Sequence, residues 1–431
     1  STTGSFKDAS RTINMEVRLN ASIQFNSWEA FYFDFDAPKL LGLADAAADL
    51  GMELFVLDDG WFGKRDDSTS SLGDWYPNEE KLKGTLKELA EKINAKGLKF
   101  GLWIEPEMTN KDSDLYRAHP DWLLAEQGKR ICHSRTQYVL DFSKKEVREY
   151  IGDMLENLLA EVPVSYIKWD MNRTFSEVFS NGNDREYQGK VCHKYILGVY
   201  ELYERLTSRF PHVLFESCAS GGARFDPGML YYAPQGWTSD DTDAIERLKI
   251  QYGTSMVYPV SCMGSHVSAS PNHQTNRVTP IETRADVAYF GTFGYELDLL
   301  KLGEEDKAEI RRQIAFMKEK RDLIQKGTFY RLKSPFEGNE TAWMIVSEDQ
   351  KKALVGYYRV MQPVNVGFKR LKLKGLKEDT CYKVSGYDYD CYGDELMQVG
   401  MILSDSASGV WKKGVNDKGD FQAKVFEIVA V

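Results

Sequence analysis

Cysteine and histidine are scarce in this chain of 431 residues, and neither occurs at a metal-binding spacing. The 6 cysteines include no CxxC pair, and Cys192 and His193 are adjacent, which is a poor geometry for two ligands of one ion. No GxGxxG follows an early apolar run, so the signature of dinucleotide binding is missing too. We therefore expect reduced cysteines, a cytoplasmic location and no metal or other cofactor.

Long apolar runs and an excess of positive charge are absent as well. No stretch reaches the length of a membrane-spanning helix, and no signal peptide opens the sequence. The formal net charge is −10, whereas nucleic-acid binding requires basic patches that neutralise phosphates. We expect no membrane and no nucleic acid among the partners, and an acidic surface suits a neutral small-molecule substrate.

Apolar, strand-like runs and amphipathic helices alternate over the first three hundred residues. The expected strands are Ile23–Ala30, Leu54–Asp59, Lys99–Glu105, Tyr138–Phe142, Tyr166–Asp170, Leu214–Ser217, Gly236–Asp240 and Val260–His266. The expected helices are Lys39–Leu50, Leu86–Lys96, Lys144–Glu161, Tyr187–Phe210, Asp243–Met256, Glu282–Phe293 and Glu304–Gln325. This alternation predicts an α/β fold, a (β/α)8 TIM barrel, rather than a doubly wound sheet.

The pattern changes after Gly327, where short β-rich runs are separated by Gly, Asp and Lys clusters. The expected strands there are Ala353–Val360, Leu371–Leu373, Cys381–Val384 and Ala423–Val429. They predict a small all-β domain, an antiparallel sandwich of roughly 100 residues. The predicted domains are a lead-in segment at residues 1–21, the barrel at 22–327 and the β domain at 328–431.

Two of the predicted barrel strands end on carboxylates that could work as a pair. The run Tyr166–Arg173 contains a strand that ends on Asp170, and the run Ser239–Asp243 contains Asp240, on which the predicted strand Gly236–Asp240 ends. Strand ends are where a (β/α)8 barrel carries its chemistry. Two carboxylates that face one pocket could serve as nucleophile and proton donor for breaking a glycosidic bond.

Other predicted strand ends carry polar or aromatic residues that a barrel interior does not need. They include Trp28-Glu29, Asp58-Asp-Gly-Trp61, Trp103-Ile-Glu-Pro-Glu107, Glu216-Ser-Cys218 with Gly221, Gly222 and Arg224, and Asp240-Asp241. A buried carboxylate is costly unless it is paired or hydrogen-bonded, so several in one pocket imply a polar ligand or a catalytic network. Sugar hydroxyls are such a ligand, because each can donate to a carboxylate and accept from Lys or Arg.

Each of these residues also has a structural interpretation. A sequence such as Asp58-Asp59-Gly is most often a solvated turn after a strand. Asp170 could be an internal ion-pair partner, and Cys218 could be no more than a small buried hydrophobe. Tryptophans on strands are usually part of the packing.

The ordered set of motifs resembles glycoside hydrolase family 36, which contains mainly microbial α-galactosidases. The resemblance spans Asn26 to Leu302. It rests on Leu57-Asp-Asp-Gly-Trp-Phe-Gly63, Gly101-Leu-Trp-Ile-Glu-Pro-Glu-Met108, Lys168-Trp-Asp-Met-Asn-Arg173, Cys218-Ala-Ser-Gly-Gly-Ala-Arg224, and Ser239-Asp240 followed by Arg247, with Pro271-Asn-His-Gln and Gly294-Tyr-Glu-Leu-Asp298 downstream.

The resemblance implies a retaining exo-α-galactosidase that removes terminal, chiefly α-1,6-linked galactose from oligosaccharides such as melibiose and raffinose. Asp170 would be the nucleophile that forms a covalent β-galactosyl intermediate, and Asp240 would be the acid/base. Their carboxyl groups should then lie about 5–5.5 Å apart. Asp241 and Asp243 are close rivals in sequence, and only the family spacing favours Asp240.

The resemblance also implies a sugar-binding set with no metal. The two adjacent aspartates would hold the 4- and 6-hydroxyls and select galactose over glucose. Lys168 and Arg135 would contact the 3- and 4-hydroxyl region or neighbouring carboxylates. Cys218 and Gly221 would lie beside the 2-hydroxyl, and Trp28 and Trp103 would form walls of the pocket. The full expected set is Trp28, Asp58, Asp59, Trp61, Trp103, Arg135, Lys168, Asn172, Cys218, Gly221 and Trp237.

Several alternatives stay open. An α-N-acetylgalactosaminidase on the same scaffold would need room for an acetamido group beside Cys218 and Gly221. Transglycosylation needs only an acceptor that outcompetes water, whereas a non-catalytic galactose-binding protein would not need both Asp170 and Asp240. Full-length family members usually carry an N-terminal β-sandwich domain that supports oligomerisation, so we expect either a piece of a longer chain or a short form, and the resemblance allows a homo-oligomer.

Overall fold

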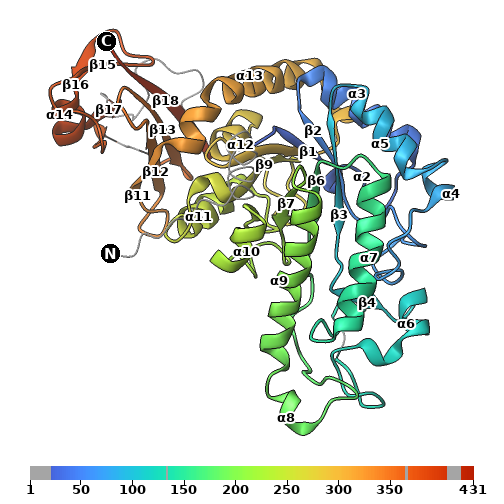
Figure 1. The fold of residues 1–431 in the computed structure, drawn as a ribbon. Helices are drawn as coiled ribbons and strands as arrows, with labels where there is room; N and C mark the ends of the chain where they lie inside the picture. Colours follow the sequence, from blue (N-terminus) through green and yellow to red (C-terminus); the bar gives the residue numbers. More distant parts are fainter. Residues whose placement is uncertain (1–20, 133, 365–366, 405–418) are drawn as a thin grey trace. The chain divides into compact units, whose positions relative to one another are not determined.

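The computed structural model describes residues 21–132, 134–364, 367–404 and 419–431 (Figure 1). Residues 1–20 of the predicted lead-in segment therefore lie outside the described residues. Within the described ranges, none of the helices is both long enough and apolar enough to cross a membrane.

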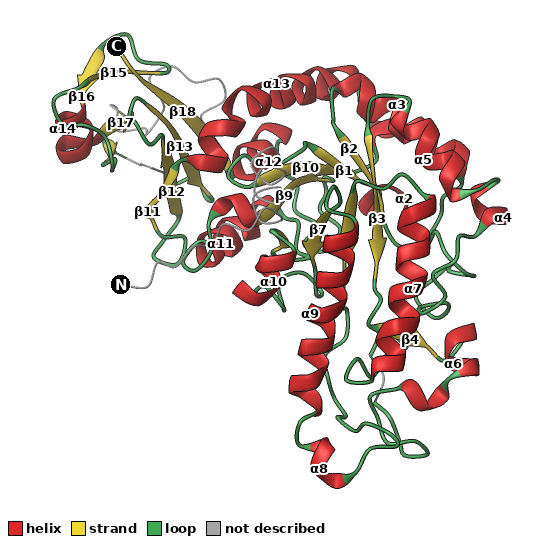
Figure 2. Cartoon of the chain, viewed as in Figure 1, coloured by secondary structure: helices red, strands yellow, loops and turns green. Residues whose placement is uncertain are grey.

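Eight strands close into a barrel in the order β1-β10-β9-β8-β7-β6-β3-β2, which confirms the predicted fold class. The strands are short, and β2 is buried along its whole length because a parallel barrel is covered on both faces. Figure 2 shows red helices outside these yellow strands. The barrel strands are β1 (Gln24–Asn26), β2 (Leu54–Leu57), β3 (Lys99–Ile104), β6 (Tyr166–Trp169), β7 (Leu214–Ser217), β8 (Gln235–Trp237), β9 (Met263–Ser268) and β10 (Thr292–Glu296).

One predicted barrel strand was wrong, and one barrel strand was not predicted. The run Tyr138–Phe142 is not a barrel strand, because β5 (Gln137–Val139) pairs antiparallel with β4 (Met108–Asn110) in a separate two-stranded sheet. The missing barrel strand is β10, which the sequence pattern had placed partly in the helix Glu282–Phe293. That helix, α12, ends at Ala288, and the Thr and aromatic residues that follow favour a strand.

Helices separate most of the barrel strands. α5 begins with a capping box, in which the Glu88 backbone N–H donates to Thr85 Oγ1 at 3.1 Å and the Thr85 N–H donates to Glu88 Oε2 at 3.0 Å. The helices are α2 (Trp28–Phe31), α3 (Ala37–Leu50), α4 (Glu79–Leu82), α5 (Leu86–Asn94), α6 (Asp114–Ala118), α7 (Lys145–Glu161), α8 (Arg185–Gln188), α9 (Val191–Arg209), α10 (Pro227–Tyr232), α11 (Ala244–Thr254), α12 (Ile281–Ala288) and α13 (Glu304–Lys326). Short 3₁₀ turns lie at Pro120–Trp122, Val260–Cys262 and Leu299–Lys301.

The chain forms two compact units. The first comprises residues 1–240 and 295–302, and the second comprises residues 241–294 and 303–431. The first unit contains the carboxyl ends of β1, β2, β3, β6, β7, β8 and β10. Every residue of the predicted site therefore belongs to the first unit.

The second unit contains the C-terminal sheet, whose strand order is β11-β12-β13-β18-β15-β16, and a two-stranded sheet of β14 and β17. These antiparallel sheets share one apolar core, as a sandwich does. Their strands are β11 (Thr328–Lys333), β12 (Glu340–Val346), β13 (Lys352–Arg359), β14 (Lys369–Leu371), β15 (Cys381–Val384), β16 (Asp390–Tyr392), β17 (Met401–Ser404) and β18 (Gln422–Ala430), with the one-turn helix α14 (Gly393–Glu395) and a π-helical turn at Leu396–Gly400.

Both faces of β12 are buried, which explains its nearly continuous apolar sequence. Met344 and its alternate neighbours face the core shared by the two sheets. Trp343 points to the other face and lies against Phe290, with ring centroids 5.7 Å apart. The Tyr358 hydroxyl on the neighbouring strand donates to the Asp286 carbonyl on α12 at 2.7 Å. The sheet and the helices of this unit thus form one packed body.

We predict that Thr85→Ala lowers the free energy of unfolding by about 1 kcal/mol, because the first turn of α5 loses its side-chain acceptor. Urea unfolding measures the change. Thr85→Ser keeps the hydroxyl and should retain most of the wild-type stability, so an equal loss in both variants would show that the capping bond is not the cause.

Candidate active site

The carboxyl ends of the barrel strands bring together most of the predicted site residues. In a parallel barrel these ends all lie at one rim. Asp58 directly follows β2, Glu105 follows β3, Asp170 follows β6 and Cys218 follows β7. Glu296 is the last residue of β10. The sequence pattern did not predict β10. Glu296 is part of a motif named above, but it was not predicted to belong to the site.

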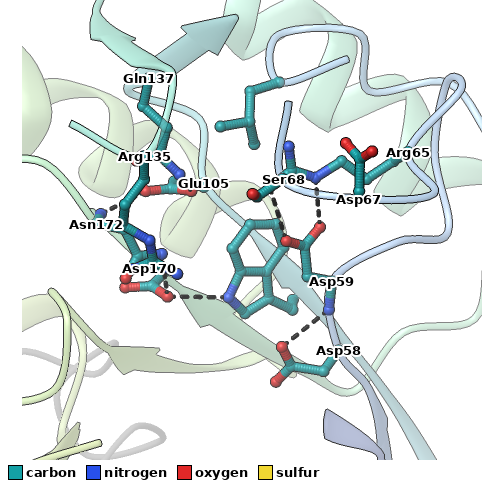
Figure 3. A network of polar contacts seen from close by, with 12 residues as sticks. Asp58, Asp59, Arg65, Asp67, Ser68, Glu105, Arg135, Gln137, Asp170 and Asn172 are labelled. Carbon is teal, nitrogen blue, oxygen red and sulfur yellow. Dashed lines mark hydrogen bonds and ion pairs between the residues drawn. The ribbon is translucent and has the colours of Figure 1, made fainter. Parts of the chain in front are cut away.

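Asp170 is held by N–H donors from three residues. Its Oδ2 accepts from Trp103 Nε1 at 3.1 Å and from Asn172 Nδ2 at 2.7 Å, and its Oδ1 accepts from the Met171 backbone N–H at 2.8 Å. Figure 3 shows Asp170 and Asn172 on one side of the network and Asp58, Asp59 and Arg65 on the other. Hydrogen bonds of this kind fix the direction of the Asp170 carboxyl group.

Asp240 follows β8 in a different environment. Its side chain keeps a solvent-exposed surface, but the protein atoms around it displace much of its hydration. This burial, together with the negative charges of Asp170 and Glu296, raises the pKa of Asp240, although Lys168 and Arg135 oppose the shift. Asp240 therefore holds a proton more readily than an ordinary aspartate does.

The two sequence rivals of Asp240 take part in the start of α11. Asp241 Oδ1 accepts from the Asp243 backbone N–H at 3.0 Å. Asp243 is the N-cap of α11, where it accepts from the Ile245 N–H at 2.8 Å, and it forms an ion pair with Arg277 at 2.6 Å. These bonds give both carboxylates a structural task at the helix N-terminus.

Asp58 and Lys168 form a buried ion pair. Lys168 Nζ lies 2.9 Å from Asp58 Oδ2, which also accepts from Asn26 Nδ2 at 2.7 Å. Although burial acts to lower it, Asp58 and other nearby carboxylates hold the pKa of Lys168 well above its ordinary value. Lys168 Nζ also lies 5.8 Å from the centroid of the Trp237 ring, within cation–π range.

Asp59 is bound by Arg65, which the sequence interpretation did not include. Arg65 Nε and Nη2 donate to the two Asp59 oxygens at 3.0 and 2.8 Å, a bidentate pair. Burial, followed by the charges of Asp58 and Asp170, still raises the pKa of Asp59 against the opposing effect of Arg65. The available sequence signal was the need of a buried carboxylate for a cation, with Lys64 and Arg65 close by in the same loop.

The tryptophans occupy unequal positions. Trp103 is buried, and its indole N–H donates to Asp170, so it reaches the centre of the site. Trp61 is fully buried, and its Nε1 donates to the Trp103 carbonyl at 2.9 Å, which places it behind Trp103. Trp28 is half-buried on α2 and contacts the edges of the Tyr32 and Phe33 rings.

Cys218 and Gly221 lie beside the two catalytic candidates. Burial, followed by the charge of Asp170, raises the pKa of the Cys218 thiol well above its ordinary value, so the thiol stays protonated. Gly221 has a φ of 81°, and a Cβ added there would lie 2.6 Å from the Asp240 backbone nitrogen. Only glycine allows this loop to approach the Asp240 backbone so closely.

Arg135 and Asn172 complete the predicted set. Arg135 is exposed, and Figure 3 shows it on the same side of the network as Asp170 and Asn172. Its charge acts on Asp240, as described above. Asn172 Oδ1 accepts from Ser220 Oγ at 3.2 Å while its Nδ2 binds Asp170. Among the described residues, no three His, Cys, Asp or Glu side chains are grouped so that they could hold a metal ion.

Not every strand-end carboxylate belongs to this set. Glu107 accepts from Trp169 Nε1 at 2.8 Å and from the Tyr195 hydroxyl at 2.6 Å, and it pairs with Arg224 at 2.8 Å. It is fully buried and satisfied by protein partners. The polar strand ends predicted from the sequence thus divide between the site and a supporting network.

Comparisons with known proteins identify the chain's relatives. A family model for melibiase matches residues 9–327, and a model for the glycosyl hydrolase family 36 C-terminal domain matches residues 340–428. Alpha-galactosidase AgaA of Geobacillus stearothermophilus is 52% identical over 413 residues, which are 95% of this chain and 55% of that protein. Alpha-galactosidase Mel36A of Lactobacillus acidophilus is 46% identical over 406 residues, 94% of this chain and 54% of that protein. The chain spans about half the length of these curated relatives.

Solved structures agree with the sequence matches. The crystal structure of the GH36 α-galactosidase AgaA from Geobacillus stearothermophilus has a TM-score of 0.91 and 49% identity, and covers 98% of this chain and 58% of its own. A variant of that protein in complex with raffinose has a TM-score of 0.92 with the same identity and coverage. The α-galactosidase from Lactobacillus brevis has a TM-score of 0.92 and 44% identity, with the same coverage. The melibiase model matches well over half of the residues, and the chain therefore belongs to glycoside hydrolase family 36.

Proposed function

We propose that the chain is the catalytic part of a retaining exo-α-galactosidase that removes terminal, chiefly α-1,6-linked galactose from small oligosaccharides. The observation that carries the proposal is the unequal pair of carboxyl groups. Asp170 accepts hydrogen bonds from N–H donors of three residues, whereas burial and the charge of Asp170 raise the pKa of Asp240. Carboxyl groups with such different environments suit a nucleophile and a general acid.

The proposed reaction has two steps. In the first, an Asp170 oxygen attacks the anomeric carbon, the bond to the leaving oxygen breaks, and Asp240 gives that oxygen its proton. In the second, Asp240 takes a proton from water, whose oxygen displaces Asp170 and releases galactose with its original anomeric configuration. This double displacement requires the two carboxyl groups to lie about 5–5.5 Å apart.

We assign the selection of the sugar to the ion pairs that Asp58 and Asp59 form. Asp58 and Asp59 would accept hydrogen bonds from the 4- and 6-hydroxyls, and each is already oriented by a buried cation. Lys168, paired with Asp58, would donate to the neighbouring hydroxyl. Such a site disfavours a sugar with one misplaced hydroxyl, because the buried polar groups would then be unpaired. Among the aromatic side chains, Trp103, Trp237 and Trp28 would wall the sugar, and the buried Trp61 would support Trp103.

The relatives support the choice of substrate. Two similar proteins, AgaA and Mel36A, are named α-galactosidases, and a variant of AgaA was crystallised with raffinose. The cytoplasmic location remains part of the proposal, and the six cysteines, which form no disulfide in the described structure, are compatible with a reducing compartment.

We predict that Asp170→Ala lowers kcat for p-nitrophenyl α-galactoside by on the order of 10⁴-fold, because no group remains to form the covalent intermediate. Azide should restore turnover by direct attack and give the β-galactosyl azide. Asp240→Ala should lose on the order of 10²–10⁴-fold on raffinose, and azide should there give the α-galactosyl azide, because Asp170 still forms the intermediate.

Asp241→Asn is the matched control, since Asp241 neighbours Asp240 and its carboxyl binds the turn before α11. This variant should keep most of the activity. Loss of acid/base behaviour in Asp241→Asn but not in Asp240→Ala would reverse the assignment. If the wild type prefers the α-N-acetylgalactosaminide, the proposed substrate is wrong and the chain is an α-N-acetylgalactosaminidase. If the folded wild type binds galactose but hydrolyses neither substrate, a binding protein is the better explanation.

We further predict that Gly221→Ala lowers kcat on the order of 100-fold, because its Cβ would displace the backbone that carries Asp240. Gly97→Ala is the matched control: Gly97 has a similar φ of 86°, but no atom lies within 4 Å of an added Cβ. Both variants should lose some stability, measured in urea, and only Gly221→Ala should lose kcat. Equal kcat losses would exclude the collision as the cause.

A further inference from the structure

The buried carboxyl of Glu105 contacts the loop that carries the proposed nucleophile. Glu105 directly follows β3 and is fully buried. Its Oε1 accepts from the backbone N–H of Asn172. Its Oε2 accepts from Gln137 Nε2 on β5 at 3.1 Å. Glu105 therefore ties the segment after β6 to two other parts of the site.

Asn172 carries the effect of Glu105 to Asp170. The Asn172 backbone is held by Glu105, while its side-chain Nδ2 donates to Asp170 Oδ2 at 2.7 Å. Ser220 Oγ donates to Asn172 Oδ1 at 3.2 Å and fixes the amide from the other side. Glu105 does not itself touch Asp170 through a hydrogen bond in the described structure. Its influence on the direction of the Asp170 carboxylate runs through Asn172.

The charges around Glu105 do not favour an anion. No Lys or Arg of the described residues forms an ion pair with it, and Arg65, whose charge acts on it, binds both oxygens of Asp59. Asp170 from β6 and Asp59 from the segment after β2 add negative charge. Burial, then the charge of Asp170, raises the pKa of Glu105 to about 8, against the opposing effects of the Asn172 N–H and Arg65.

The hydrogen bonds of Glu105 are compatible with a proton on Oε2. The Gln137 amide can be turned by half a turn without changing its shape, because its oxygen and nitrogen are assigned from their surroundings. The Gln137 Oε1 atom is buried and has no partner in the described structure. In the turned orientation this oxygen would accept from a protonated Oε2, while Oε1 of Glu105 would still accept from Asn172.

We propose that Glu105 is a positioning residue for Asp170 and that it acts as a neutral carboxylic acid at neutral pH. This inference rests on the proposed role of Asp170 as nucleophile. A neutral acid holds Asn172 in place without adding a second negative charge beside Asp170. An anion at the same position would make Asp170 easier to protonate and would remove the nucleophile at mildly acidic pH.

The experiment compares Glu105→Gln and Glu105→Ala with the wild type on p-nitrophenyl α-galactoside across the acidic and neutral pH range. Glu105→Ala should lower kcat by on the order of 100-fold, because Asn172 loses its acceptor. Glu105→Gln should restore most of that loss, since an amide oxygen can accept from Asn172. The acid limb of its kcat/KM profile should coincide with that of the wild type, because no charge has been removed.

A stability series gives a second measurement that does not depend on activity. With a pKa of about 8 in the folded protein and an ordinary value of 4.5, Glu105 keeps a proton on folding that the unfolded chain releases. The stability that this group contributes is full below pH 4.5 and is lost as the pH rises through about 8. The Tm of Glu105→Gln should therefore rise relative to the wild type over this range. Glu319→Gln, an exposed position on α13, is the control and should show a constant difference.

Each result has a defined meaning. A shift of the Glu105→Gln acid limb to lower pH, with a constant Tm difference, would show that Glu105 is ionised and would overturn the proposal. Loss of kcat in Glu105→Gln as large as in Glu105→Ala would also overturn it. A wild type without galactosidase activity would remove the proposed function, and the Tm series would then decide the protonation state of Glu105 by itself.

Discussion

The site depends on one electrostatic constraint. The barrel brings several carboxyl groups into a small buried region, and their negative charges must be compensated there. Parallel strands all end at the same rim, so a carboxylate placed after several of them converges with the others. Asp58, Glu105 and Asp170 come from three neighbouring strands. Each would be costly as an unpaired anion, and together they would repel one another. The other groups of the site are the cations and hydrogen-bond donors that offset this unfavourable energy.

The compensation takes three forms, and each suits a different task. Asp58 and Asp59 are paired with buried cations, which orient them as hydrogen-bond acceptors. Asp170 is held by N–H donors, which fix the direction of its carboxyl group. Asp240 is surrounded by protein and negative charge, which favours its protonated form. These surroundings differ in the way that the proposal requires of a binding group, a nucleophile and an acid of one residue type.

The sequence was sufficient for much of this arrangement because the barrel strands that carry Asp58, Asp170 and Asp240 are short apolar runs followed directly by polar residues. The sequence did not predict an element whose pattern is ambiguous, or a contact that depends on how a loop folds. β10 follows α12 with no clear break, so its last residue, Glu296, was not placed in the site. The bidentate pairing of Arg65 with Asp59 depends on how a loop folds back, which no periodicity encodes. Likewise, the tertiary structure decides that Trp61 is fully buried with its indole N–H bound to the Trp103 carbonyl.

The most direct test of this account is to trap the covalent intermediate. A fluorinated galactosyl fluoride that forms the intermediate quickly and releases it slowly would label the nucleophile, and mass spectrometry of the digested protein would locate the added sugar. The account predicts one label, on the peptide that contains Asp170, and none on the peptide that contains Asp240. A label on Asp59 or Glu105, or hydrolysis with inversion and no label at all, would contradict the assignment of charges on which the site has been explained.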